Sequence, residues 1–172
     1  MKSSIIKKII LSFKMESQNK TIILGCDHGG FELKETLKQY LSDKKYKVED
    51  VGCYTADRVD YPDYAAKVCE GVQKDSTNNI GLVVCGSGIG ISIAANKFKG
   101  IRCSISNDIY SAIQSRKNDD SNVLSLGCRV IGEESAKLIT DAFLTTKFEG
   151  DSEAFNKRLE KVKAIEEKYL KA

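Results

Sequence analysis

Histidine, proline and tryptophan are almost absent from this chain. One histidine, one proline and no tryptophan occur in 172 residues, and the six cysteines include no C-x-x-C pair. A single histidine with dispersed cysteines cannot build the usual zinc clusters, so we expect no metal site. Six scattered thiols in an α/β-type chain are typical of a reducing compartment, which favours a cytoplasmic location.

A strong charge of one sign and a long apolar run are also missing. The net charge is +3, and no basic run is interleaved with aromatic residues, so nucleic-acid binding has little support. No apolar segment is long enough to span a membrane. Near the N-terminus, Lys14 ends an apolar core that is shorter than the roughly 7–15 residues of a signal peptide. We interpret 1–20 as a non-core extension, with a targeting peptide as the alternative, and 21–172 as one domain.

Short apolar strands alternate with amphipathic helices along that domain. This alternation predicts a Rossmann-like three-layer α/β sandwich, in which helices cover both faces of a five-stranded parallel sheet. A long C-terminal helix follows, and its apolar stripe covers its own domain or reaches a second subunit. The predicted strands are 21–24, 48–51, 80–84, 101–105 and 123–126, and the predicted helices are 33–41, 62–72, 91–97, 108–117, 133–145 and 155–169.

A glycine-rich loop after the third predicted strand is the main functional signal. It has the sequence Cys-Gly-Ser-Gly-Ile-Gly over residues 85–90 and leads into a helix. Successive backbone amides at a helix start form an anion site, and Cys85 at its mouth suits a base or nucleophile beside an oxyanion. The dinucleotide fingerprint would need glycine where Ile91 stands, so a nicotinamide enzyme is the weaker alternative. Without a ligand, the loop would be a tight turn and Cys85 a buried apolar residue.

Other polar residues follow strands at the same edge of the predicted sheet. Asp27 and His28 come directly after the first strand, and Arg129 comes just past the fifth. Ligands of parallel α/β sheets bind at the carboxyl ends of the strands. Arginine suits a phosphate because its guanidinium donates two parallel hydrogen bonds, which also makes Arg158 on the terminal helix a candidate. A surface salt bridge is the alternative for either arginine.

Together these segments resemble the type B ribose-5-phosphate isomerase family, which includes galactose- and allose-6-phosphate isomerases. The resemblance runs in order along nearly the whole chain after the extension. Its segments are 25–31, 60–65, 85–97, 100–102, 122–124 and 127–130.

The resemblance implies an aldose–ketose isomerase of the pentose phosphate pathway. Such an enzyme interconverts ribose 5-phosphate and ribulose 5-phosphate through a cis-enediolate, without a metal or an organic cofactor. It also implies an obligate homodimer or a dimer of dimers, because family active sites lie between two subunits.

The resemblance further assigns a role to each candidate residue. Cys85 would shuttle the proton between the two carbons, and Ser87 would relay the proton between the oxygens. Asp27 would bind sugar hydroxyls. The oxyanion would be held by the loop amides of Gly86, Gly88, Ile89 and Gly90, and the phosphate by His28, Arg129 and Arg158.

Two positions depart from the family pattern. The family usually carries a ring-opening histidine where this chain has Asn118, whose amide does not titrate near neutral pH. Either Asp119 or Asp120 takes over ring opening, or the enzyme accepts mainly the open-chain sugar, or its activity is reduced. Of these, we expect that the sugar ring opens slowly while isomerisation of the open chain remains intact. The first of two family arginines on the terminal helix aligns near Ala154, with Lys157 as a point charge nearby.

Two other functions remain as alternatives to a ribose-5-phosphate isomerase. One is a hexose-6-phosphate isomerase, and the other is a sugar-phosphate-binding protein with lost or reduced catalysis.

Overall fold

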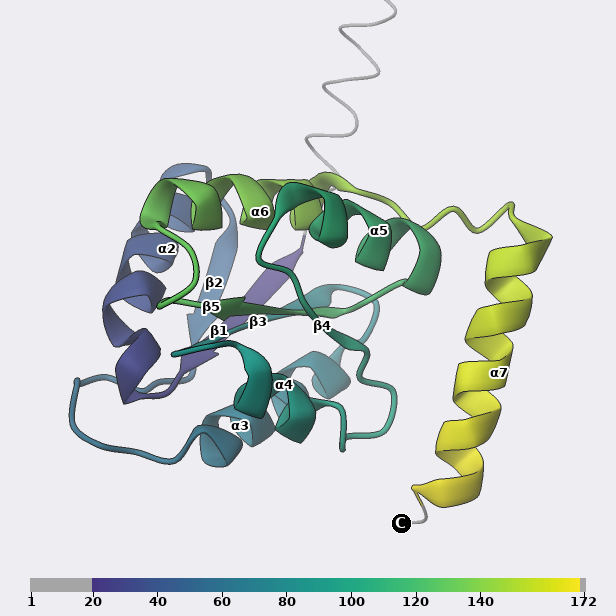
Figure 1. Cartoon of the computed structure of the whole chain (residues 1–172), viewed down its shortest axis with the longest axis horizontal. Coiled ribbons are helices and arrows are strands. Elements are labelled where there is room, and N and C mark those ends of the chain that lie inside the picture. The colour runs from purple at the N-terminus through teal and green to yellow at the C-terminus, as the bar shows by residue number, and fades with distance from the viewer. Residues whose placement is uncertain (1–19, 171–172) are drawn as a thin grey trace, which may run out of the picture.

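The computed structural model describes residues 20–170 and contains an all-parallel five-stranded sheet between two helical layers (Figure 1). The strand order is β2-β1-β3-β5-β4. The chain leaves β1 toward one edge of the sheet and returns to build the other edge from β3, so the direction of winding changes between β1 and β3. A crevice for ligands opens at such a switch point. The strands are β1 (Thr21–Cys26), β2 (Lys47–Asp50), β3 (Asn79–Cys85), β4 (Cys103–Ile105) and β5 (Val123–Gly127).

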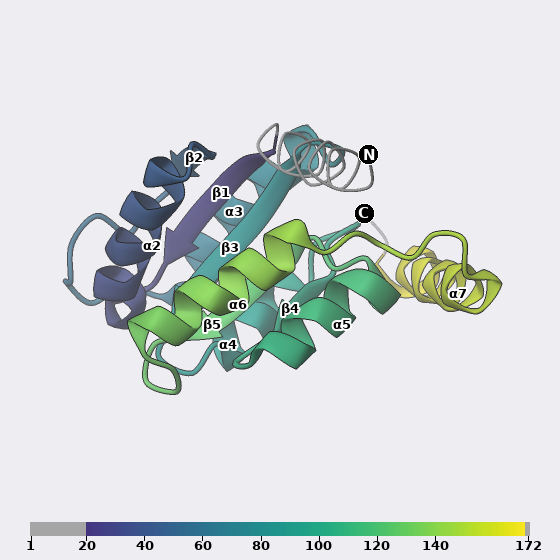
Figure 2. The same cartoon turned by 90° about the horizontal axis from the view of Figure 1, so that it is seen from above.

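The helices fall into two layers and one outlying element (Figures 1 and 2). One face of the sheet is covered by α2 (Phe31–Asp43), α5 (Ile109–Asp119) and α6 (Glu133–Thr145), and the other face by α3 (Tyr61–Lys74) and α4 (Ile89–Ala95). A short 3₁₀ turn, η1 (His28–Gly30), links β1 to α2, and α7 (Glu153–Tyr169) ends the described chain.

The central strands are buried on both faces, which explains their continuous apolar sequences. In β1, Ile22 and Leu24 pack into one apolar core with α2, α5 and α6. Ile23 points the other way, into a second core with α3 and α4. The edge strand β2 alternates exposed and half-buried residues instead, because successive side chains point to opposite faces and α2 packs on the face that carries Val48 and Asp50.

Helix α7 stands beside the sandwich and buries none of its residues (Figure 2). It begins at the Ser152 cap, whose hydroxyl accepts a hydrogen bond from the Phe155 amide. Near its other end, Glu166 Oε1 accepts a hydrogen bond from the Gly100 amide at 2.7 Å. A groove of about 450 Å³ separates the helix from the body. The apolar side chains of Val162, Ile165 and Tyr169 stay 51%, 60% and 70% exposed.

The predicted fold class is confirmed, and the differences concern element ends. The fourth strand forms only over Cys103–Ile105, and the helix predicted over 91–97 spans Ile89–Ala95. All six cysteines are free thiols. Among residues 20–170, no helix is long and apolar enough to cross a membrane. The extension predicted at 1–20 lies, apart from Lys20, outside the described residues.

Candidate active site

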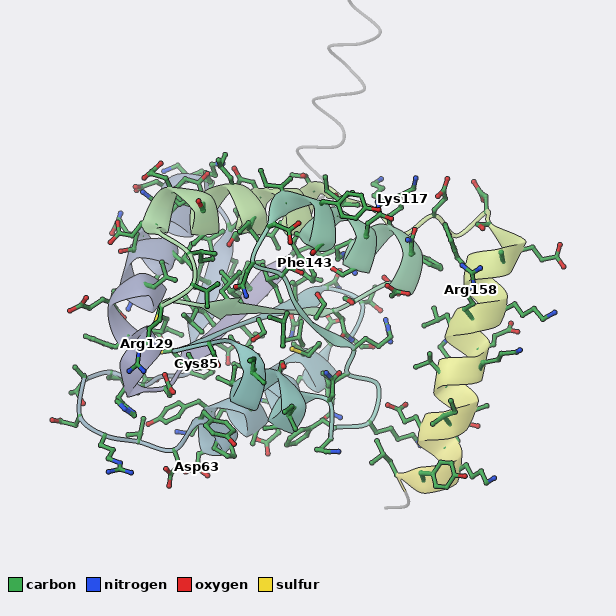
Figure 3. The ribbon with its side chains drawn as sticks, in the orientation of Figure 1. Asp63, Cys85, Lys117, Arg129, Phe143 and Arg158 are labelled. Atoms are coloured by element: carbon green, nitrogen blue, oxygen red, sulfur yellow. The ribbon has the colours of Figure 1, made fainter. Side chains whose placement is uncertain are left out.

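Three loops meet at the carboxyl edge of the sheet, beside the point where the winding changes direction. They follow β1, β3 and β5 and bring together Asp27, Gly86 and Arg129. A Cβ atom built on Gly29 would lie 3.4 Å from Asp27 Oδ1 and 3.8 Å from Arg129 Nη2. The same atom would lie 3.7 Å from the amide nitrogen of Gly86. A carboxylate, a guanidinium and a backbone amide therefore surround one small space, with Cys85 nearby (Figure 3).

Cys85 is the last residue of β3 and is 4% exposed. The Gly88 amide donates a hydrogen bond to Cys85 Sγ at 3.1 Å, a contact that strengthens when the sulfur is ionised. Gly88 has φ +79°, a left-handed backbone conformation in which glycine is unstrained. Its carbonyl accepts a hydrogen bond from the buried Ser125 hydroxyl at 2.7 Å. The hydrogen bond from Ser125 thus helps to fix Gly88, whose amide faces the sulfur of Cys85.

The other polar groups of this loop are more exposed. Ser87 is exposed, and its Oγ accepts a hydrogen bond from the Ile89 amide at 3.3 Å. Two of the loop amides thus already have partners within the loop, those of Gly88 and Ile89. Gly86 and Gly90 are half-buried at the two ends of the loop.

The loop after β5 is joined to the loop after β3 by backbone hydrogen bonds. The Cys128 amide donates to the Cys85 carbonyl, and the Arg129 amide donates to the Gly86 carbonyl, both at 2.9 Å. Gly127 permits this approach, because a Cβ there would lie 2.6 Å from the Ser87 carbonyl oxygen. The exposed guanidinium of Arg129 consequently lies against Gly86.

The loop after β1 presents Asp27 and His28. Asp27 Oδ1 accepts a hydrogen bond from the Gly30 amide at 3.0 Å and so caps η1. His28 Nδ1 lies 3.1 Å from the carbonyl oxygen and 3.3 Å from the amide nitrogen of Val59. This contact occupies Nδ1, so a ligand would meet Nε2.

Sequence reasoning missed Val59 and Tyr61, which belong to the loop between β2 and α3 and to the start of α3. Val59 holds the ring of His28. Tyr61 packs so closely on the loop after β3 that a Cβ on Gly90 would lie 2.8 Å from its ring. Tyr61 falls within the segment 60–65 that resembles the family, but it lies just before the helix predicted over 62–72, and its sequence context does not predict a contact with the glycine-rich loop.

The structure separates three predicted site residues from the rest. Asn118 and Asp119 end α5, which runs back to the amino edge of the sheet, and Asn118 Nδ2 donates to Gln114 Oε1 at 2.8 Å. Asp119 and Arg158 line the groove beneath α7. Figure 3 shows Arg158 and Lys117 at the end of the molecule opposite Cys85 and Arg129. A single chain therefore does not bring these residues to the Cys85 site.

Burial makes most of the other thiols poor acids. It raises the pKa of Cys69 to about 12 and also raises the pKa of Cys26, Cys103 and Cys128 above their ordinary value. These four thiols stay protonated near neutral pH. They therefore lack the thiolate that proton transfer or nucleophilic attack requires.

Known proteins resemble this chain over most of its length. The family described as Ribose/Galactose Isomerase matches residues 22–162. Ribose-5-phosphate isomerase B of Escherichia coli is 44% identical over 149 residues, which are 87% of this chain and 98% of that protein. The structure of Clostridium thermocellum ribose-5-phosphate isomerase B has a TM-score of 0.83 at 41% identity, with 87% of this chain and 99% of that chain covered. The structure of Mycoplasma genitalium ribose-5-phosphate isomerase B with bound ribulose 5-phosphate has a TM-score of 0.82 at 32% identity, with 87% of this chain and 98% of that chain covered.

Proposed function

The chain belongs to the ribose/galactose isomerase family, and we propose that it interconverts ribose 5-phosphate and ribulose 5-phosphate. The observation that carries the proposal is the meeting of Cys85, the glycine loop, Asp27 and Arg129 at one edge of the sheet. This set supplies a proton carrier, hydrogen-bond donors for a developing charge, and groups for hydroxyls and phosphate.

Cys85 acts as the base in the proposed mechanism. Its thiolate removes the proton from carbon 2 of the open-chain aldose, and the electrons of that bond form a cis-enediolate. The same thiol then returns the proton to carbon 1, which gives the ketose. Ser87 relays the proton between the two oxygens, and the amides of the loop from Gly86 to Gly90 stabilise the negative charge. The hydrogen bond from the Gly88 amide fixes the position of Cys85 Sγ for these two proton transfers.

Substrate binding divides between the two ends of the sugar. Asp27 binds hydroxyl groups, and Arg129 and His28 bind the phosphate. The proximity of Arg129 to Gly29 and the seating of the His28 ring on Val59 support this assignment. Arginine provides the charge-assisted bidentate contacts that phosphate favours.

We further propose that the enzyme is a homodimer, or a dimer of dimers, with active sites shared between chains. The unburied helix α7 and its exposed apolar side chains support a partner surface there. In such a dimer, Arg158 of the partner subunit would complete the phosphate site, and Asn118 and Asp119 of the partner would stand near the sugar ring. Asn118 cannot donate a proton as an acid, so Asp119 takes that part or the ring opens slowly.

Substrate comparison and isotope exchange test the proposed reaction. We expect turnover of ribose 5-phosphate to exceed turnover of allose 6-phosphate and galactose 6-phosphate. We also expect exchange of the carbon-2 proton when ribose 5-phosphate is incubated with the enzyme in deuterated water. A preference for a hexose phosphate would change the substrate assignment, and the absence of exchange would favour a binding protein without catalysis.

A further inference from the structure

Lys34 is a fully buried charged residue outside the set of groups used by the proposed mechanism. It lies on α2, on the inner side of the helix, and its side chain is 0% exposed. Its Nζ lies 2.9 Å and 2.8 Å from the two carboxylate oxygens of Asp50 and 2.7 Å from Glu35 Oε1. Burying a charge is an inefficient way to stabilise a fold, because desolvation offsets much of the Coulomb attraction. The contacts of Lys34 indicate that it has a role besides stabilising the fold through these ion pairs.

The ammonium group also fixes a backbone carbonyl at the start of the loop 51–60. Lys34 Nζ donates a hydrogen bond to the Cys53 carbonyl at 2.9 Å, and the ring of Tyr54 lies 5.4 Å from it. Asp50, the other partner of this ammonium, accepts a hydrogen bond from the Gly52 amide at 3.0 Å. One buried cation therefore orders consecutive residues of the loop.

This end of the loop is joined to the residue that precedes Asp27. The Cys53 amide donates to the Cys26 carbonyl at 3.1 Å, and the Cys26 amide donates to the Gly52 carbonyl at 2.7 Å. The loop then passes through exposed residues 54–58 and returns to the site at Val59, where it holds the ring of His28. The segment is thus anchored at both ends and exposed in between.

We propose that Lys34 is a positioning residue that holds the loop 51–60 in its ligand-ready arrangement by fixing the Cys53 carbonyl. This inference rests on the proposed function, because the loop contributes Val59, the support of His28, to the sugar-phosphate site. Burial alone would lower the pKa of Lys34, but hydrogen bonds from its ammonium to Asp50 and Glu35 outweigh that effect and raise the pKa. The anchor therefore stays charged throughout the physiological range.

Lys38 offers a matched control. Its Nζ also contacts Asp50 and Glu35, at 2.8 Å and 2.9 Å, but it is 37% exposed on the outer side of the pair. Lys34→Met and Lys38→Met thus remove a cation from the same two carboxylates. Only the first removes the donor to the Cys53 carbonyl. Asp50 keeps Lys38 and the Gly52 amide in Lys34→Met, so we expect that variant to fold.

Cleavage by an arginine-specific protease tests the positioning role without relying on catalysis. Arg58 is exposed in the middle of the loop, and the chain has only five arginines, so mass spectrometry can follow fragments 1–58 and 59–172. Cleavage reports the population in which the loop is open. We expect Lys34→Met to be cut after Arg58 about tenfold faster than wild type, and Lys38→Met within about twofold of it. Arg58→Lys should abolish these fragments, which confirms their assignment.

Kinetics add a measurement that a purely structural role would not move selectively. If the loop is ordered in only a fraction of free molecules, KM rises by the inverse of that fraction while bound substrate restores the loop. We expect KM for ribose 5-phosphate to rise about tenfold in Lys34→Met, with kcat changed less than about threefold.

The outcomes separate this inference from the proposed function. Unchanged cleavage after Arg58 in Lys34→Met, or equal acceleration in both variants, would overturn the positioning role and leave the isomerase proposal intact. A wild-type enzyme without turnover would overturn the proposed function, while cleavage would still decide the role of Lys34. Should Lys34→Met not fold, Lys34→Gln serves in the same assay, because its shorter side chain falls one bond short of the Cys53 carbonyl.

Discussion

Cys85 and the Gly88 amide form the smallest unit of the proposed chemistry. The sulfur is almost enclosed, yet it has a backbone donor 3.1 Å away. Such a donor stabilises a thiolate without supplying a proton of its own to the substrate. The thiol can therefore exchange a proton between two neighbouring carbons.

Cys85→Ala should remove the proton carrier while leaving the binding groups in place. We expect kcat for ribose 5-phosphate to fall by about 10²–10⁴, the usual contribution of a general base, with KM changed little. Steady-state kinetics with Cys69→Ala as a control for loss of a buried thiol checks this. Retention of most activity in Cys85→Ala would assign the base elsewhere.

Gly30 is required because the backbone of β3 passes directly beside it. A Cβ on Gly30 would lie 2.5 Å from the Val84 carbonyl oxygen, whereas a Cβ on Gly132 meets nothing within 4 Å. We expect Gly30→Ala to lower the free energy of unfolding by about 1–3 kcal/mol. Gly132→Ala should stay within about 0.5 kcal/mol of wild type. Urea denaturation checks both variants, and equal stabilities would refute the steric argument.

At the scale of elements, α2 and β2 are joined by a charged cluster around Asp50. Burial alone would raise the pKa of Asp50, but hydrogen bonds from Lys34, Lys38 and the Gly52 amide outweigh it and hold that pKa below its usual range. A carboxylate with a depressed pKa stabilises the folded state above its unfolded pKa of about 3.9. That contribution is lost as the pH falls through the lower folded-state value.

Asp50→Asn should therefore destabilise the protein in a pH-dependent way. We expect a loss of about 1–3 kcal/mol in the free energy of unfolding at pH 7. The difference from wild type should be smaller at pH 3 than at pH 7, because pH 3 lies below the unfolded-state pKa of about 3.9, where the contribution of the depressed pKa has begun to fall. Urea titrations of both proteins at the two pH values measure this. A difference that stays constant with pH would show that the charge of Asp50 does not matter.

The sequence predicts most elements and the central part of the site, for identifiable reasons. Apolar runs predict the buried strands β1, β3 and β5, and the position of a residue just after such a strand predicts the place of Cys85, Asp27 and Arg129. Lys34 could not be predicted to be buried, because its partners Asp50 and Cys53 are 16 and 19 residues away. The contact between His28 and Val59 spans 31 residues and uses the backbone of Val59, which no side-chain pattern encodes.

At the scale of the whole molecule, Arg158 and Cys85 lie toward opposite sides of a single folded chain (Figure 3). The position of Arg158 on a helix follows from the sequence, but its proposed role in the phosphate site requires the dimer proposed above. The pattern of apolar and polar residues within one chain does not directly specify how two chains are arranged. The groove beneath α7 and its exposed apolar stripe are where the assembly should be sought.

Mixed dimers test the shared site. Cys85→Ala and Arg158→Ala homodimers should each be strongly impaired. Coexpression should restore about a quarter of wild-type activity, because half of the dimers are mixed and each mixed dimer has one intact site. Activity of differently tagged, purified mixtures, with light scattering for the oligomeric state, checks this. Activity no greater than that of the two homodimers would show that Cys85 and Arg158 do not meet in one site from two different chains.

The backbone bonds that join residues 128 and 129 to 85 and 86 also bear on which sugars fit. They join the turn at residues 128–130 to the end of β3, so the backbone segments that carry the thiol and the guanidinium are held side by side. If Arg129 binds the phosphate as proposed, these bonds help to set the distance from the phosphorus to the reacting carbons. A sugar one carbon longer would then have to bend in order to bind, so the proposed preference for a five-carbon sugar would arise at the rigid edge of the sheet rather than in the exposed loop 51–60.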